Sequence, residues 1–245
     1  MTIKIFKNTI GIADYLIESL IQPSLNNEKT DFINIALSGG STPTAIFTNI
    51  VEHYNNKINW QKIRLFWGDE RCVPPGDDES NYKMTRKFLI DRVEIPENNI
   101  FRILGEEEPE KEALRYETLV LDKLPLKKGI PRFDLMLLGL GEDGHTASIF
   151  PGSLNLFETN NLFTSIQNPH NKQNRITATG KLINHATKIV FMVTGETKAK
   201  MVEKVIQRPD DNSKFPASHI KPVDGELYWL LDESAASLLE IIQSD

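Results

Sequence analysis

The sequence predicts an α/β fold in which helices cover both faces of a mostly parallel β-sheet. Short apolar segments alternate along the chain with amphipathic ones. The segment 133–140, FDLMLLGL, is apolar throughout, as expected of a parallel strand buried on both faces. After the apolar segment 32–37, apolar side chains recur at a period of about 3.6 residues, which is the period of a helix. Regular alternation of strands and helices is typical of this fold class.

The expected elements follow in chain order. We expect strands at residues 3–6, 32–37, 62–67, 133–140, 188–194 and 227–232. We expect helices at residues 10–22, around the apolar positions 46, 47, 50, 51 and 54, at 80–92, at 110–124, around the apolar positions 199, 202, 205 and 206, and at 233–243. This order is Rossmann-like. We expect one domain over residues 1–245, with room for a small inserted subregion within residues 75–130.

Composition narrows the class of protein. The chain has 245 residues, of which 40% are hydrophobic and 25% charged, so it can bury a substantial core without disulfide or metal support. The single cysteine, Cys72, excludes an intrachain disulfide and suits the cytoplasm. A signal peptide is not expected, because the first 20 residues include Asp14 and Glu18 and offer no small-residue cleavage site.

Charge and hydropathy also bear on partners. The net charge of −6 argues against a nucleic-acid partner. No apolar run approaches the about 20 residues that span a membrane, so we expect no membrane partner. We expect a monomer that binds a small molecule.

The first candidate site is the segment SGGSTP, residues 38–43, between a strand and a helix. Gly39 and Gly40 permit a turn that places several N–H groups on one concave side, and Ser38, Ser41 and Thr42 add hydroxyl donors. Pro43 suits the first position of a helix, whose positive end attracts anions. These features favour phosphate binding. The alternative is an ordinary strand-to-helix turn, and the lysine of a P-loop is absent.

The second candidate site is GLGEDGH, residues 139–145, after the buried strand. It matches the dinucleotide pattern G-x-G-x-x-G, but Glu142 and Asp143 would repel a pyrophosphate, so we do not favour that interpretation. His145 lies beyond the carboxyl end of a strand and at an expected helix start, where a positive helix end would favour the neutral imidazole that accepts a proton. Asp143 would orient the ring. The alternative is a capping or buried structural histidine.

Other polar residues are less distinctive when each is taken alone. Asp69, Glu70 and Arg71 follow the third strand, and a solvated ion pair is the simplest interpretation of them. Arg175 and Lys198 stand at element edges, where surface charges are common. The five histidines form no metal-binding motif, so we expect no metal, and no G-x-S-x-G elbow indicates a serine hydrolase.

Together the motifs resemble a known family. SGGSTP, FWGDERCVP with SNY, FDLMLLGLGEDGHTASIFP, RITATGKLINHA and VTGETKAKMV occur in this order. They are similar to the 6-phosphogluconolactonases of the oxidative pentose phosphate pathway, in the glucosamine-6-phosphate isomerase/6-phosphogluconolactonase family. The resemblance covers essentially the whole chain and implies a NagB-type sugar-phosphate isomerase fold.

Two relatives in the same superfamily suggest other functions. Glucosamine-6-phosphate deaminases typically have a glutamate shortly after the histidine, where this chain has Phe150, and Asp-Glu-Tyr where it has Asp69, Glu70 and Arg71. Phenylalanine cannot ionise, so the ring-opening relay is not expected here. Sugar-phosphate sensor domains of transcription regulators follow a helix-turn-helix, which we do not expect because the first strand begins at Ile3.

The resemblance implies hydrolysis of 6-phospho-D-glucono-1,5-lactone to 6-phospho-D-gluconate without a cofactor. His145 would act as general base for water, with Asp143 orienting it. Backbone N–H groups near Gly141–Gly144, or Arg71, would stabilise the oxyanion. The residues implied to bind substrate or its phosphate are Ser38, Gly39, Gly40, Ser41, Thr42, Asp69, Arg71, Gly144, Arg175 and Lys198.

Overall fold

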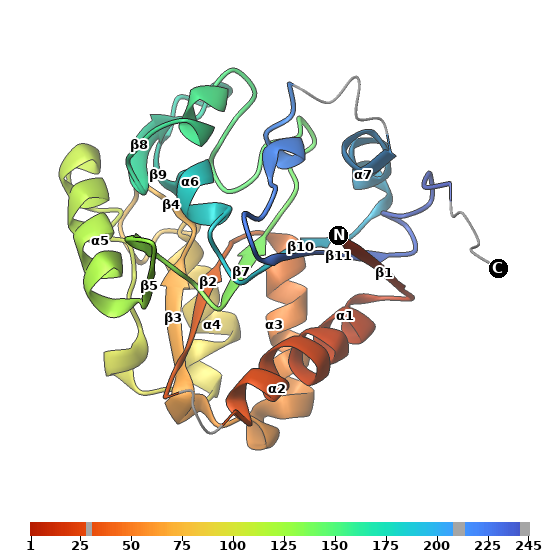
Figure 1. The fold of residues 1–245 in the computed structure, drawn as a ribbon. Helices are drawn as coiled ribbons and strands as arrows, with labels where there is room; N and C mark the ends of the chain where they lie inside the picture. The colour runs from red at the N-terminus through yellow and green to blue at the C-terminus, as the bar shows by residue number, and fades with distance from the viewer. Residues whose placement is uncertain (28–30, 208–213, 241–245) are drawn as a thin grey trace.

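The central element of the fold is a parallel β-sheet. The computed structural model describes residues 1–27, 31–207 and 214–240. Within them, six parallel strands pair in the order β1-β11-β10-β7-β2-β3 (Figure 1). Their bounds are β1 Thr2–Phe6, β2 Ile33–Leu37, β3 Ile63–Trp67, β7 Leu135–Leu138, β10 Lys188–Val193 and β11 Glu226–Asp232. All six lie at strands expected from the sequence, and the predicted α/β class is confirmed.

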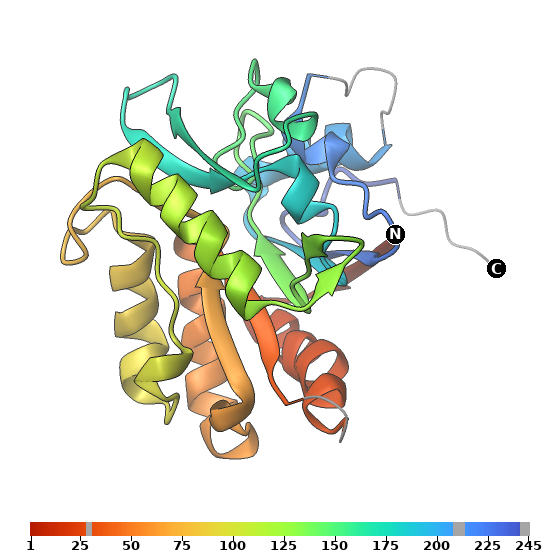
Figure 2. The same ribbon diagram turned by 60° about the vertical axis from the view of Figure 1, so that its left-hand side comes forward.

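Helices pack on both faces of this sheet. One face carries α1 (Thr9–Tyr15), which continues through a π-helical segment (Leu16–Ile21) into α2 (Gln22–Leu25), together with α3 (Ser41–Tyr54) and α4 (Asn81–Phe88). The other face carries α5 (Pro109–Lys123) and α7 (Ala199–Gln207) (Figures 1 and 2). The short α6 spans Gly180–Ile183. Short 3-10 helices lie at Asn55–Lys57, Trp60–Lys62, Ile90–Arg92, Glu97–Asn99, Leu154–Phe157, Glu196–Lys198 and Pro216–His219.

Local sequence explains where several helices begin. Asn8 accepts hydrogen bonds from the N–H groups of Ile10 and Gly11 and so caps α1. Ser80 accepts from the N–H of Lys83 at the start of α4. These are the side-chain types that satisfy the unpaired N–H groups of a first helical turn. The expected helix at residues 80–92 is shorter than predicted, because α4 ends at Phe88 and a 3-10 turn follows.

A second, antiparallel sheet lies beside the first. It pairs β4 (Asp69–Arg71), β9 (Asn174–Ala178) and β8 (Phe163–Gln167) in that order. These strands are not predicted from the sequence, because β4 has only charged residues and the other two mix polar with apolar ones. Their pairing depends on tertiary contacts and not on a local pattern. A small hairpin joins β5 (Leu126–Lys127) to β6 (Ile130–Pro131).

The predicted C-terminal helix at residues 233–243 is wrong over the residues that the structure describes. Residues 233–238 form turns and 239–240 have no regular structure, while 241–243 lie outside the described residues. Glu240 is instead tied to α7, since its N–H donates to Gln207 Oε1 and its carbonyl accepts from Gln207 Nε2. These contacts occupy backbone groups that a continuing helix would use.

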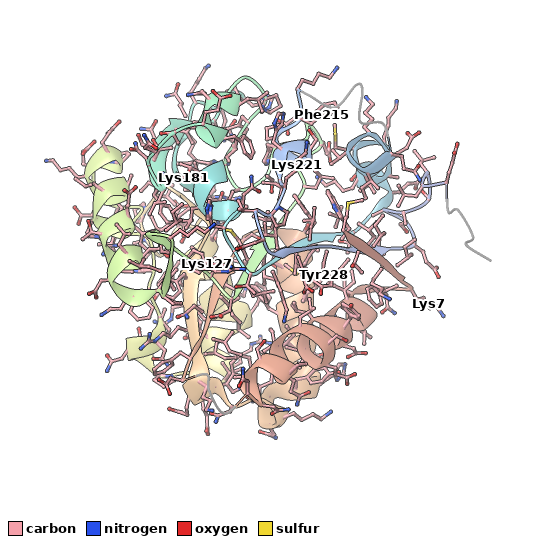
Figure 3. All side chains as sticks on the ribbon, viewed as in Figure 1. Lys7, Lys127, Lys181, Phe215, Lys221 and Tyr228 are labelled. Carbon is pink, nitrogen blue, oxygen red and sulfur yellow. The ribbon has the colours of Figure 1, made fainter. Side chains whose placement is uncertain are left out.

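One hydrophobic core extends across both sides of the central sheet. Phe191 of β10 and Trp229 of β11 stack with their ring centroids 4.0 Å apart, and both are fully buried. Burial of each such side chain contributes roughly 1.5–3 kcal/mol to stability. Charged side chains such as Lys7 project from the outside of the molecule (Figure 3). Segment 75–130 supplies α4 and α5, and its existence as a separate subregion stays a prediction.

Candidate functional site

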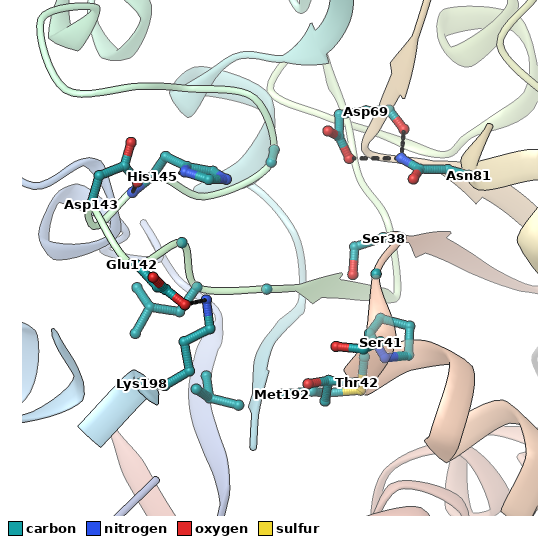
Figure 4. A pocket seen from close by; sticks show the side chains of 18 of the residues that line it. Ser38, Ser41, Thr42, Asp69, Asn81, Glu142, Asp143, His145, Met192 and Lys198 are labelled. Carbon is teal, nitrogen blue, oxygen red and sulfur yellow. Dashed lines mark hydrogen bonds and ion pairs between the residues drawn. The ribbon is translucent and has the colours of Figure 1, made fainter. Parts of the chain in front are cut away.

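The largest collection of predicted site residues lines one pocket. This cavity of about 700 Å³ lies beyond the carboxyl ends of β2, β3, β7 and β10 (Figure 4). The chain runs from β2 outward to β3 and later returns to the other side of β2 as β7, so the strand order reverses here. Ligand sites of open α/β sheets form at such a reversal. The predicted residues that line it are Ser38, Gly39, Gly40, Ser41, Thr42, Asp69, Arg71, Asp143, His145, Arg175 and Lys198.

Gly144 is the predicted site residue that does not line the pocket. Its φ of +85° favours glycine, and a Cβ there would lie 2.6 Å from the ring of Phe215 (labelled in Figure 3). Gly144 therefore lets the loop turn and pack against Phe215, which is a structural role.

The loop after β2 has the geometry of an anion site. Gly40 has a φ of +111°, which few other residues adopt, and α3 begins at Ser41. The N–H groups in the first turn of a helix have no intrahelical partner, and the helix end carries partial positive charge. Pro43 occupies the third helical position and not the predicted first one, but it still lies in that first turn. This end of α3 therefore offers N–H donors to the pocket.

Gly39 is required for a different reason. A Cβ at this position would lie 1.7 Å from Oδ1 of Asn81. The absence of a side chain lets the loop pack directly against α4.

His145 and Asp143 form a close pair on the opposite side of the pocket (Figure 4). His145 Nδ1 lies 2.5 Å from Asp143 Oδ1, and the same oxygen accepts the His145 backbone N–H at 3.0 Å. Burial raises the pKa of Asp143, but the hydrogen bonds and charge of His145 outweigh burial and hold that pKa well below its usual range. A carboxylate at Nδ1 leaves Nε2 as the ring atom that accepts a proton.

The pair lies in a loop and not at the start of a helix. The prediction that a positive helix end favours the neutral imidazole of His145 is therefore wrong. Residues 141–150 form turns and a short bridge between Thr146 and Ile149. The Gly141 N–H donates to the His145 carbonyl at 2.8 Å, and the Gly144 N–H donates to the Gly141 carbonyl at 3.0 Å. The loop therefore fixes itself by internal hydrogen bonds. The same observation removes the helix that a bound dinucleotide would need after G-x-G-x-x-G.

Phe150 packs against the His145 ring. It is fully buried, with its ring centroid 5.0 Å from that of His145 and 5.9 Å from the guanidinium carbon of Arg175. An ionisable side chain at this position would be buried between two functional groups, and Phe150 places an apolar surface there.

Asp69 and Glu70 are buried, so the interpretation of Asp69, Glu70 and Arg71 as a solvated ion pair is wrong for both carboxylates. Asp69 Oδ2 accepts from Ser148 Oγ at 2.7 Å, and Asn81 Nδ2 donates to the Asp69 carbonyl at 2.9 Å. Asp69 also faces the pocket. Asn81 Nδ2 also reaches Asp69 Oδ1 at 3.4 Å, so the two carboxylate oxygens are contacted from two other segments.

Glu70 has a structural role. It accepts hydrogen bonds from the N–H groups of Arg71, Asn81 and Tyr82, each at 2.8 Å. Burial raises the pKa of Glu70, while these N–H donors act in the opposite direction. The carboxylate joins the start of α4 to β4 and thereby places Asn81 at the pocket.

Arg71 and Arg175 are neighbours across β4 and β9. Among the described residues, no side chain or backbone group accepts a hydrogen bond from the Nε atom of either arginine, and the buried Ser38 Oγ also lacks a partner there. Burial lowers the pKa of Arg175, an effect that the nearby Asp69 carboxylate opposes. A half-buried guanidinium with spare donors is suited to an anionic ligand.

Lys198 approaches the pocket from the 3-10 turn Glu196–Lys198, after β10. Its Nζ lies 3.8 Å from Glu142 Oε1, and that carboxylate is largely exposed. Such a long, solvated ion pair is weak. The ammonium group is therefore available to an anion held between Lys198 and the loop after β2.

Three residues at the site were not predicted from the sequence. Asn81 and His170 line the pocket, and Ser148 donates a hydrogen bond to the Asp69 carboxylate. Asn81 belongs to the quoted SNY motif, which was a usable signal. Ser148 likewise belongs to the quoted motif FDLMLLGLGEDGHTASIFP. His170 carried no such signal, because it lies outside the motifs and its partner Asp143 is distant in sequence.

The described residues contain no group of three or more His, Cys, Asp or Glu side chains arranged to hold a metal ion. In the same part of the chain, no helix is both long and apolar enough to cross a membrane.

Comparisons with known proteins agree with the geometry. Residues 11–229 match the family model described as glucosamine-6-phosphate isomerases/6-phosphogluconolactonase. A 6-phosphogluconolactonase of Haemophilus influenzae is 42% identical over 91% of this chain and 92% of its own. A solved structure named devB protein has 37% identity and a TM-score of 0.90, and covers 96% of this chain and 98% of its own. The 6-phosphogluconolactonase of Trypanosoma brucei has 29% identity and a TM-score of 0.83, over 97% and 98%.

Proposed function

Because the chain belongs to the glucosamine-6-phosphate isomerase/6-phosphogluconolactonase family, we propose that it hydrolyses 6-phospho-D-glucono-1,5-lactone to 6-phospho-D-gluconate, in the oxidative pentose phosphate pathway. A lactone is a cyclic ester, so the reaction needs an activated water, donors for the developing oxyanion and a grip on the remote phosphate. The lactone carbonyl is itself the electrophile, and the proposed reaction uses no metal or organic cofactor.

The observation that carries the proposal is the contact of 2.5 Å between His145 Nδ1 and Asp143 Oδ1 at the pocket wall. Asp143 holds the Nδ1–H tautomer, and His145 Nε2 takes a proton from water as the water attacks the lactone carbonyl. The imidazolium that forms is stabilised by the Asp143 carboxylate, and it gives its proton to the ring oxygen as the bond between that oxygen and the carbonyl carbon breaks. General-base assistance of this kind contributes about 10²–10⁴-fold to rate.

The phosphate binds between the loop 38–42 and the side chains of Arg175 and Lys198. Support comes from the open N–H groups at the start of α3 and from the spare donors of Arg175. Remote contacts of this type orient the reacting carbon and convert binding energy into rate. Asp69, fixed by Ser148, would accept hydrogen bonds from sugar hydroxyls.

For the oxyanion, Arg71 is the favoured donor. The N–H groups of Gly141 and Gly144 already donate within their own loop, whereas the Arg71 guanidinium lines the pocket, where its Nη1 donates to the Glu79 carbonyl. A charged donor aimed at developing negative charge is an effective form of transition-state stabilisation.

The deaminase alternative is disfavoured by Phe150. Ring opening of an amino sugar needs an ionisable group near the histidine, and here a buried apolar ring packs against His145. A non-catalytic sensor is disfavoured by the assembled His145–Asp143 pair. Release of ammonia from glucosamine 6-phosphate would revive the first alternative, and ligand binding without turnover the second.

The test is a coupled assay with freshly generated lactone, corrected for spontaneous hydrolysis. His145→Ala should lower kcat at least about a hundredfold while the protein stays folded. His53→Ala, on the exposed end of α3, is the matched control and should keep wild-type activity. Near-normal turnover of His145→Ala would remove His145 from the mechanism.

Localisation and assembly belong to the same proposal. A chain with a single half-buried cysteine and no disulfide is suited to the cytoplasm. We also propose a monomer, which sedimentation or size-exclusion chromatography would test.

A further inference from the structure

We propose that His170 is a positioning residue that holds Asp143 in the orientation needed by His145; the inference rests on the lactonase function proposed above. His170 Nε2 lies 3.2 Å from Asp143 Oδ2, while Asp143 Oδ1 receives the ring and backbone of His145. The two oxygens of one carboxylate are thus held by two imidazoles. Neither the family motifs nor the spacing of histidines in the sequence indicates this contact.

The segment that carries His170 is built to present it. His170 lies in the turn between β8 and β9, where the Asn168 N–H donates to the Gln173 carbonyl at 2.8 Å and the Lys172 N–H to the Asn168 carbonyl at 2.9 Å. The His170 N–H donates to Asn168 Oδ1 at 2.9 Å. These bonds fix the backbone of the turn, although the His170 side chain is 70% exposed. A fixed backbone lowers the entropy lost when the ring meets Asp143.

The contact matters because Asp143 is otherwise held from one side. Both hydrogen bonds to Oδ1 come from His145, two residues away, and the Asp143 side chain is 27% exposed, so water competes for Oδ2. A donor on Oδ2 fixes the plane of the carboxylate and keeps Oδ1 directed at His145 Nδ1. The same hairpin continues into β9, which carries Arg175, so one hairpin supplies both the contact with Asp143 and a side chain of the proposed phosphate site.

The expected effect is on turnover and not on substrate binding. Removal of a largely exposed hydrogen bond to a carboxylate should lower kcat by about threefold to tenfold. KM should stay within about twofold, because the side-chain contact of His170 is with Asp143 and not with a residue proposed to bind phosphate. The factor should be the same for glucono-1,5-lactone, which lacks the phosphate, as for the phosphorylated lactone.

The experiment compares wild type, His170→Ala, His170→Gln and the control His53→Ala with both lactones. Gln presents a donor at about the reach of His Nε2 and should restore kcat to within about twofold of wild type. An unchanged kcat in His170→Ala would overturn the inference, and so would a loss confined to KM or to the phosphorylated lactone. Equal loss in the Ala and Gln variants would also overturn it.

A second readout separates this inference from the proposed function. If wild type hydrolyses neither lactone, the proposed function fails, and the contact is then judged from the imidazole NMR signals of His145 at fixed pH. These signals should move in His170→Ala and return in His170→Gln. Unmoved His145 signals in His170→Ala would overturn the positioning role whether or not the enzyme is active.

Discussion

Gly141→Ala tests whether the exact placement of the His145 ring sets the rate. A Cβ at Gly141 would lie 2.1 Å from His145 Nδ1 and 2.7 Å from Asp143 Oδ1. Heavy atoms in ordinary contact are about 3.5 Å apart, so the ring must shift by more than about 1 Å. A displacement of that size costs about 10²-fold in rate. We therefore expect kcat to fall about a hundredfold, with a smaller change in KM, since the phosphate contacts lie elsewhere.

The assay is lactone hydrolysis above the spontaneous rate, together with a thermal unfolding curve. Overpacking of this kind costs about 1–3 kcal/mol of stability, so the variant should still be folded at 25 °C. Gly76→Ala is the matched control, because a Cβ at Gly76 meets nothing within 4 Å and the position lies outside the pocket. A folded Gly141→Ala variant with wild-type kcat would refute the reasoning, since it would show that the ring position is not critical.

Three further predictions follow from the charges and burial of single residues. Lys198→Ala should raise KM at least about tenfold with a smaller change in kcat, as expected for one lost charge contact to a phosphate; unchanged kinetics would exclude Lys198 from phosphate binding. Burial, reinforced by the Glu70 carboxylate, raises the pKa of the Cys72 thiol to about 11. Alkylation of the native protein by iodoacetamide, measured by mass spectrometry, should therefore be slow at pH 7.5 and accelerate only as the pH approaches 11. Rapid labelling at pH 7.5 would contradict this. Burial raises the pKa of Asp143, but the hydrogen bonds from His145 outweigh burial and hold that pKa below its unfolded value of about 3.9. The ionised carboxylate therefore contributes stability above that pH, and this stability is lost on acidification through the folded pKa. In urea titrations, Asp143→Asn should be less stable than wild type at pH 6 and the difference should be smaller below pH 4, whereas a pH-independent difference would argue against the linkage.

The fold class was readable from the sequence because its signals are local. Each central strand is a short apolar run, and each long helix repeats apolar side chains at the helical period. When the apolar face of each helix packs on the sheet, the apolar side chains of both are buried. The C-terminal segment broke this rule. Its pattern also favours a helix, but Gln207 engages the backbone of Glu240, and a tertiary contact decided the conformation.

The second sheet was not readable for a related reason. β4 is Asp-Glu-Arg, which no strand pattern predicts, and it is a strand because β9 pairs with it. That pairing also brings Arg71 and Arg175 together, so the arginine pair was predicted as two separate residues but not as neighbours.

The site shows the same division. The sequence by itself determined the glycines, the hydroxyl residues and the Asp143–His145 spacing, because a turn and a two-residue hydrogen bond are local features. Only the tertiary structure decided that His145 lies in a loop without a helix, that Phe150 backs its ring, and that Asp69 is buried against Ser148. It also brought His170 to within 3.2 Å of Asp143, across 27 residues of chain. Contacts between distant segments depend on how the whole core packs, and no short stretch of sequence encodes them.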